Sequence, residues 1–146
     1  MRIAGATVTV LAGIAGLIAL FVPYVSYSDG PPFSLIPLDS IGVVGDSPDG
    51  QSLAFALEPL GVAVALIVVG VAAFAARSRL VAGLAIGLGV GLALNHGSFW
   101  MSLSDPNFEQ HAAAGLYVGL AAGAAALIGG LFLALDRPAT PDHPAA

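Results

Sequence analysis

Apolar residues gather along the chain in four long blocks separated by shorter polar segments. The blocks span residues 3–22, 53–76, 80–101 and 112–135, and a helix that crosses a bilayer needs about 20 mostly apolar residues. A helix satisfies its own backbone hydrogen bonds in lipid, so each block can cross the membrane on its own. The pattern therefore predicts an all-α membrane protein, a bundle of four transmembrane helices.

The third block is the least regular of the four. Its strictly apolar part, Leu80 to Leu94, is too short to cross a hydrocarbon core of about 30 Å at about 1.5 Å per residue. To span the bilayer, the helix has to include the polar and aromatic stretch from Asn95 to Trp100. We therefore expect the final third of this helix to lie against protein or in the membrane interface.

Composition excludes several classes of protein. Hydrophobic residues make up 58% of the 146 positions and charged residues 9%, whereas soluble domains carry about 25% charged residues. The four basic residues are all arginine and there is no cysteine. A cytosolic enzyme, a nucleic-acid binder and a disulfide-stapled secreted domain are all excluded.

The arginines predict the orientation of the bundle. With four spans, Arg2, Arg77, Arg79 and Arg137 fall on the same side of the membrane. The positive-inside rule makes that side cytoplasmic, so both termini are expected inside a multi-pass plasma-membrane protein. The long loop of residues 23–52 is then extracytoplasmic.

That outer loop contains five prolines and several turn signals. Its apolar stretches at 33–36 and 41–44 can pair as short strands or lie on the membrane surface. A loop of this length above a small bundle predicts a partly ordered cap, and a poorly ordered connector is the alternative. The transmembrane domain is expected to cover 1–137, and the proline-rich tail 138–146 to be disordered.

Glycines at four-residue spacing predict where helices pack closely. Residues four apart share a helix face, and glycines there let two backbones approach in a membrane. We expect the third and fourth helices to pack on each other through these faces, and a seam between subunits is the alternative. The helix-packing residues are Gly83, Gly87, Gly91, Gly115, Gly119 and Gly123.

Five polar residues near the outer boundary form a candidate polar site. Ionisable groups inside a membrane are costly and often functional, and a His–carboxylate cluster can bind a metal or relay protons. No metal-ligand spacing is present, so histidines that cap helix ends at the interface are the favoured interpretation. A carboxylate in the opening turn of the second helix is explained by the helix dipole. The residues are Glu58, Asn95, His96, Glu109 and His111.

The layout resembles a group of small, mostly uncharacterised four-helix membrane proteins of high-GC actinobacteria. The matching features are Pro23-Tyr24 after the first helix, the turn Arg77-Ser78-Arg79, the stretch Gly115-Leu116-Tyr117, and 127–130 in the fourth helix. Tyr24 stands where such proteins more often have Trp. The resemblance implies a four-helix bundle, but it implies no activity and transfers no site residue.

These observations lead to a functional hypothesis without an enzymatic step. We expect a non-catalytic accessory or scaffold subunit, with no cofactor or metal, that meets a membrane-protein partner or a second copy through its outer face. The alternative is a small oligomeric transporter or channel with a polar path near His96 and Glu58. An enzyme of the outer leaflet is the weakest interpretation, because no catalytic arrangement stands out.

Overall fold

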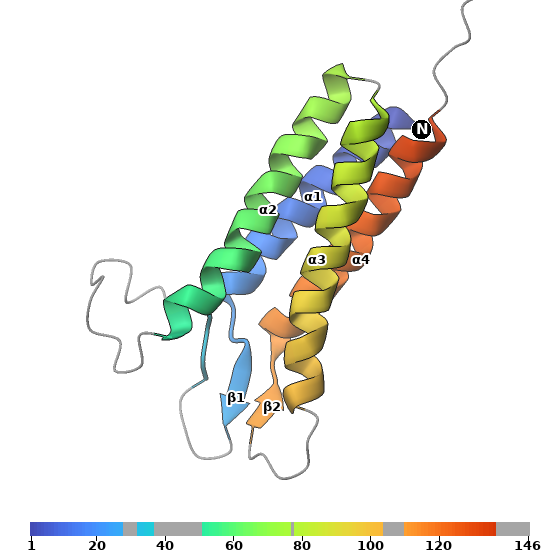
Figure 1. Cartoon of the computed structure of the whole chain (residues 1–146). Coiled ribbons are helices and arrows are strands. Elements are labelled where there is room, and N and C mark those ends of the chain that lie inside the picture. The colour runs from blue at the N-terminus through green and yellow to red at the C-terminus, as the bar shows by residue number, and fades with distance from the viewer. Residues whose placement is uncertain (28–31, 37–50, 77, 104–109, 137–146) are drawn as a thin grey trace, which may run out of the picture.

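The computed structural model describes residues 1–27, 32–36, 51–76, 78–103 and 110–136. All four helices within these ranges are long and apolar enough to cross a membrane, so the predicted four-helix architecture is confirmed. The elements run in the order α1 (Arg2–Phe21), β1 (Val25–Tyr27), α2 (Gln51–Ala75), α3 (Arg79–Leu103), β2 (Gln110–Ala112) and α4 (Ala114–Leu135) (Figure 1).

Successive helices run in opposite directions, so both ends of the described chain lie at the same end of the bundle (Figure 1). α1 packs against α2 and α4, and α4 packs against α3, whereas contact between α2 and α3 is sparser. The amino group of Met1 lies 3.7 Å from Oδ1 of Asp136, just after α4. We call this end, which also holds the turn between α2 and α3, the terminal end. The opposite end, with β1 and β2, is the loop end.

Glycines allow the helix backbones to touch. A Cβ atom at Gly5 of α1 would lie 2.9 Å from the carbonyl oxygen of Gly129 in α4. A Cβ atom at Gly13 would lie 2.8 Å from the carbonyl oxygen of Ala63 in α2. Both distances are shorter than van der Waals contact, so at these helix separations the two positions require glycine. Small residues at helix crossings are the common means of packing in lipid.

A buried hydroxyl lies where α1 meets α4. Thr9 is fully buried, and its hydroxyl donates a hydrogen bond to the carbonyl oxygen of Gly5 at 2.8 Å. The polar group is thereby satisfied within its own helix. A Cβ atom at Gly129 would lie only 2.6 Å from the Thr9 oxygen, so this glycine leaves the space that the threonine occupies.

α2 begins at Gln51, two residues before the apolar block. Glu58 therefore lies about two turns into the helix, and the first turn holds no acidic residue. The predicted role of Glu58 at the helix N-terminus is wrong, because the favourable field of a helix end decays within the first turn. Pro59 is also inside the helix, where it is buried.

α3 continues to Leu103, so the stretch from Asn95 to Trp100 is helical, as predicted. Within this stretch the exposure alternates with the helical period. His96 is fully buried, whereas Ser98, on the opposite side of the helix, is exposed. This part of α3 thus places the imidazole of His96 against the rest of the bundle.

Two segments distant in the sequence pair at the loop end. β1 and β2 are antiparallel, with Val25 opposite Ala112 and Ser26 opposite His111. Phe33 forms an isolated bridge with Val25, to whose carbonyl oxygen its N–H donates at 2.8 Å. The segment after α1 is therefore hydrogen-bonded both to Phe33 and to the segment before α4.

Of the two stretches predicted to pair as strands, 33–36 contributes only the bridge at Phe33. The other, 41–44, lies outside the described residues, as does the tail 138–146. The strand pair itself was not predicted. Each strand has three residues, which is too short for an alternating pattern to be recognised.

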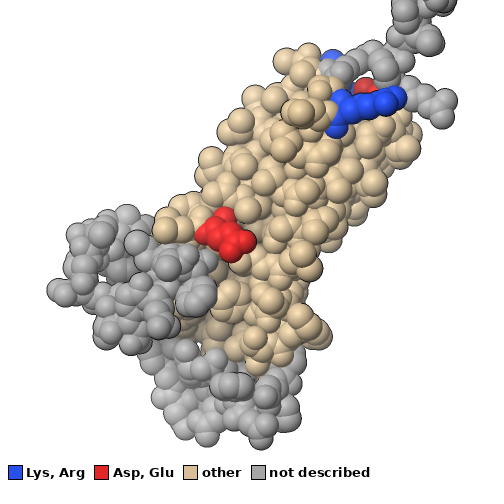
Figure 2. All heavy atoms as spheres, viewed as in Figure 1, with Lys and Arg blue, Asp and Glu red and all other residues tan. Residues whose placement is uncertain are grey.

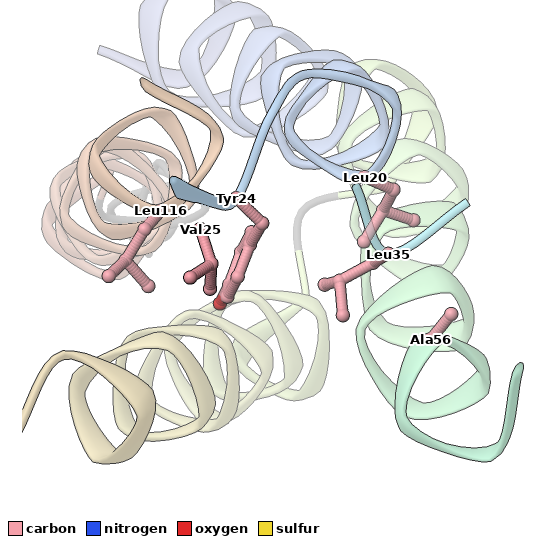
Figure 3. Packing of buried hydrophobic residues seen from close by; sticks show 6 residues of the cluster. All are labelled: Leu20, Tyr24, Val25, Leu35, Ala56 and Leu116. Atoms are coloured by element: carbon pink, nitrogen blue, oxygen red, sulfur yellow. The ribbon is translucent and has the colours of Figure 1, made fainter. Parts of the chain in front are cut away.

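A cluster of buried hydrophobic residues lies beneath these strands. Figure 3 shows side chains from α1, α2, α4 and the two segments after α1 converging there. The N–H of Ile36 donates to the carbonyl oxygen of Leu20 at 2.9 Å, which holds residues 32–36 over the end of α1. We call this group the loop-end cluster: Leu20, Tyr24, Val25, Leu35, Ala56 and Leu116.

Candidate functional site: a buried tyrosine and histidine

The three α4 glycines identified in the sequence are buried against two different helices. Gly119 and Gly123 face α3. A Cβ atom at Gly123 would lie 2.8 Å from the backbone nitrogen of Ala93, and one at Gly119 would overlap the imidazole of His96. Gly115 faces α1 instead, where its Cβ position is 2.8 Å from the carbonyl oxygen of Ala19.

The three glycines predicted for the matching face of α3 lie elsewhere. A Cβ atom at Gly83, Gly87 or Gly91 would meet no described atom within 4 Å. The predicted packing of this glycine stripe on α4 is therefore wrong. The face that α3 turns toward the bundle holds Ala82, Ala85, Gly89, Leu92 and His96.

The position of His96 explains why α3 packs on the bundle through the face that carries Leu92 and His96. Successive residues of a helix are about 100° apart, so the face of Gly83 and Gly87 lies roughly opposite the face of Leu92 and His96. Burying the glycine face would leave the imidazole in lipid, where a polar group without partners is costly. Gly89 lies on the buried face and provides the close approach, with its Cβ position 2.9 Å from the backbone nitrogen of Leu127.

His96 is the buried polar side chain of this interface. Its side chain is fully enclosed, and its Nδ1 lies 2.9 Å from the carbonyl oxygen of Leu92, one turn earlier in α3. A carbonyl oxygen only accepts, so Nδ1 carries the proton and Nε2 carries a lone pair. Nε2 is buried without a hydrogen-bond partner among the described residues. The favoured interpretation, a histidine capping a helix end at a wet interface, is therefore wrong for His96.

Tyr24 joins this site from the segment between α1 and β1. Its side chain is fully buried, and its ring lies 5.6 Å from the imidazole of His96, centroid to centroid. Figure 3 shows the ring extending toward α3. The Tyr24 hydroxyl has no hydrogen-bond partner among the described residues. Burial raises the pKa of this phenol, so it remains neutral well into the alkaline range.

Two neighbours on α3 complete the surroundings of the pair. The ring of Phe99 meets that of Tyr24 edge to face at 5.5 Å, an arrangement that stabilises aromatic pairs. The side-chain oxygen of Asn95 is buried, again with no described hydrogen-bond partner. The end of α3 thus combines aromatic packing with three polar atoms that lack described partners, on Tyr24, Asn95 and His96.

The other predicted site residues do not join this pair. Glu58 on α2 and His111 in β2 are both exposed, and no hydrogen bond or ion pair among the described residues links either of them to His96. Glu109 lies outside the described residues. Among those that are described, no group of three or more His, Cys, Asp or Glu side chains is placed to hold a metal ion.

The chemistry available at the pair is that of hydrogen bonding and proton uptake. Neutral imidazole offers an acceptor at Nε2, and the phenol offers a donor. Histidine is also the side chain whose ordinary pKa lies nearest to physiological pH. The sequence indicated His96 as a candidate but not Tyr24 as its neighbour, because the contact joins residues 72 positions apart. The Pro23-Tyr24 pair entered the sequence analysis only as a feature of the resemblance to other four-helix proteins.

The fold and the site together define a class, a four-helix bundle whose helices are all suited to crossing a membrane. No protein-family model, curated protein or solved structure matches the chain. The likeness to actinobacterial four-helix proteins therefore depends on layout alone.

Proposed function

We propose that this chain is a non-catalytic accessory subunit of a plasma-membrane assembly, which binds a partner membrane protein through its loop end. The observation that carries the proposal is the ordered structure of that end. β1, β2 and Phe33 are joined by backbone hydrogen bonds above the loop-end cluster. A connector that only joins helices needs no such structure, whereas a binding surface benefits from being held on rigid elements.

In this proposal the terminal end faces the cytoplasm. Figure 2 shows the basic side chains of this view gathered at the terminal end. Arg2 and Arg79 begin α1 and α3 there, and the sequence between 80 and 136 contains no further Lys or Arg. The positive-inside rule then directs the loop end to the extracytoplasmic side.

The outward face of α3 supports a partner that also spans the membrane. Gly83, Gly87 and Gly91 present backbone rather than side chain at three successive turns, with nothing described in front of them. In lipid, such a stripe allows a second helix to approach closely. The proposed partner therefore contacts the loop end above the membrane and this face of α3 within it.

Cross-linking and co-purification from mild detergent test the proposal. The full chain should elute with a defined partner at a mass above that of the monomer. His111→Glu at the exposed edge of β2 should weaken recovery of the partner, and Gly87→Leu should weaken it by closing the α3 stripe. Ser78→Arg, an exposed change at the terminal end, is the matched control and should leave recovery unchanged. A chain that elutes alone at monomer mass, with and without cross-linker, would overturn the proposal.

A further inference from the structure

His96 has one ring nitrogen committed and the other uncommitted, inside a fully enclosed site. The Nδ1–H donates to the carbonyl oxygen of Leu92. Nε2 has no described hydrogen-bond partner, and the ring edge that carries it lies against the α4 backbone at Gly119. A second proton on this ring has to bind at Nε2, because Nδ1 already carries one.

That second proton would create a cation with nothing described to balance it. From the segment before β1 the imidazole is faced by Tyr24, whose phenol is neutral. From α4 it is faced by Gly119, while Tyr117 of that helix is exposed. On α3 itself its polar neighbour is Asn95, which is uncharged.

The charged groups of the remaining elements do not pair with it either. His111 of β2 and Glu58 of α2 are exposed and make no described hydrogen bond or ion pair with His96. The titratable side chain of α1, Arg2, begins that helix at the terminal end. A charged imidazole in this place would lose its hydration without gaining an ion pair, which is strongly unfavourable.

We propose that His96 is a buried proton-binding site, and that uptake of a proton separates the loop-end part of α3 from Tyr24 and from α4. The imidazole is held by packing on Gly119 and Tyr24 and by one hydrogen bond within its own helix. No described hydrogen bond or ion pair from the side chain crosses to another element. Release therefore requires only that these packed surfaces part, after which the cation can reach water or the membrane interface.

The direction of the pH dependence follows from linkage. An exposed imidazole takes up a proton near pH 6.5, whereas the closed arrangement offers the charged form no compensation. Lowering the pH below that value therefore favours the open form, and uptake of one proton changes the open-to-closed ratio by at most about tenfold per pH unit. Above about pH 7 the closed form should predominate.

The only tryptophan of the chain provides a reporter that needs no mutation. Trp100 lies one turn after His96 on α3 and is 45% exposed. The full chain, in mild detergent, is titrated from pH 8 to pH 5 while the emission and quenching of Trp100 are recorded. We expect one reversible transition below about pH 6.5, with the helical circular dichroism unchanged.

Variants assign the transition to one histidine. His111→Gln together with His143→Gln removes the other two imidazoles and should leave the transition in place, whereas His96→Gln should abolish it. Because His96→Gln can fail to fold, ¹⁵N spectra of the histidine side chains in the His111/His143 double variant follow Nε2 of His96 directly. Protonation should coincide with the change at Trp100.

A second reporter locates the movement. Leu116→Cys places a thiol at a fully buried position of the loop-end cluster, and its labelling rate is normalised to that of Ser98→Cys, an exposed position. The ratio should rise several-fold at pH 5, while the ratio for Ala126→Cys, deeper in the bundle, stays constant. A transition that persists in folded His96→Gln, or protonation of His96 without any change in Trp100 or the labelling ratio, would overturn the proposal. Loss of the transition in Asp105→Asn or Glu109→Gln would also overturn it, because the proton would then belong to a pair with a loop carboxylate.

Discussion

Gly119 of α4 lies directly against the imidazole of His96 of α3, so the missing side chain at one position makes room for the side chain at the other. The two residues are on consecutive helices of the sequence, but nothing in their spacing connects them. The contact sets both the separation of α3 and α4 and the burial of the histidine. It also distinguishes Gly119, whose position has no room for a side chain, from Gly87, whose position is open, although both belong to glycine stripes with the same spacing.

Gly119→Ala should destabilise the protein, whereas Gly87→Ala should not. The added methyl at 119 overlaps the imidazole, and overpacking of a tight interior costs about 1–3 kcal/mol. The methyl at 87 meets nothing described within 4 Å, and alanine favours the helix by up to about 1 kcal/mol. Unfolding in a titration with denaturing detergent measures both. Equal losses in the two variants would contradict the assignment of the faces of α3.

The protein should lose stability in alkali through Tyr24. Burial raises the pKa of this phenol, so the folded state holds the phenolic proton more tightly than the unfolded state does. The associated stability is fully present below the ordinary tyrosine value of about 10 and is lost as the pH rises above it. Melting temperatures from pH 8 to pH 11.5 should fall in the wild type and fall less in Tyr24→Phe. Parallel curves for the two proteins would show that Tyr24 is not responsible.

The strand pair at the loop end can be tested with a disulfide. Ser26 and His111 are opposite each other in the register of β1 and β2. Opposite Cα atoms in an antiparallel pair are about 4.5–5.5 Å apart, which is within the Cα separations that disulfides span, about 4.4–6.8 Å. The chain has no cysteine, so Ser26→Cys with His111→Cys should cross-link under mild oxidation and change mobility on a gel. The control pair, Ser26→Cys with Ser78→Cys, should remain reduced, because the two positions lie at opposite ends of the bundle. Failure of the first pair to cross-link in folded protein would contradict the register.

The proposed orientation predicts which cysteines can be reached from outside the cell. In intact cells a membrane-impermeant maleimide should label Ser26→Cys at the loop end. The same reagent should label Ser78→Cys at the terminal end only after the membrane is permeabilised. The reverse pattern would place the arginine-bearing turn outside and exchange the two faces of the protein.

The helices could be predicted to within a few residues because lipid imposes a simple requirement. A helix that crosses a bilayer must make all its backbone hydrogen bonds within itself and needs about 20 mostly apolar residues. Both requirements concern neighbouring residues in the sequence. The strand pair could not be predicted in the same way. Three-residue strands have little preference of their own, and β1 and β2 exist because α1 and α4 bring Val25 and Ala112 side by side.

The glycine stripes show the same limit for the candidate site. Of the three α4 glycines at four-residue spacing, Gly119 and Gly123 face α3, whereas Gly115 faces α1. On α3, the spacing could not tell which side of the helix would meet α4, because both sides carry glycine. Burial of His96 and Leu92 fixed the rotation of the helix, and those energies depend on what α4 and Tyr24 offer across the interface.

The sequence by itself determined the class, the number of helices suited to crossing a membrane and the distribution of charge, since these follow from the cost of placing polar groups in hydrocarbon and are summed residue by residue. Only the tertiary structure decided that Tyr24 meets His96, that Glu58 and His111 face outward, and that one α3 glycine stripe is left open. Those outcomes depend on the relative rotation of packed helices, which is set by contacts between residues far apart in the chain.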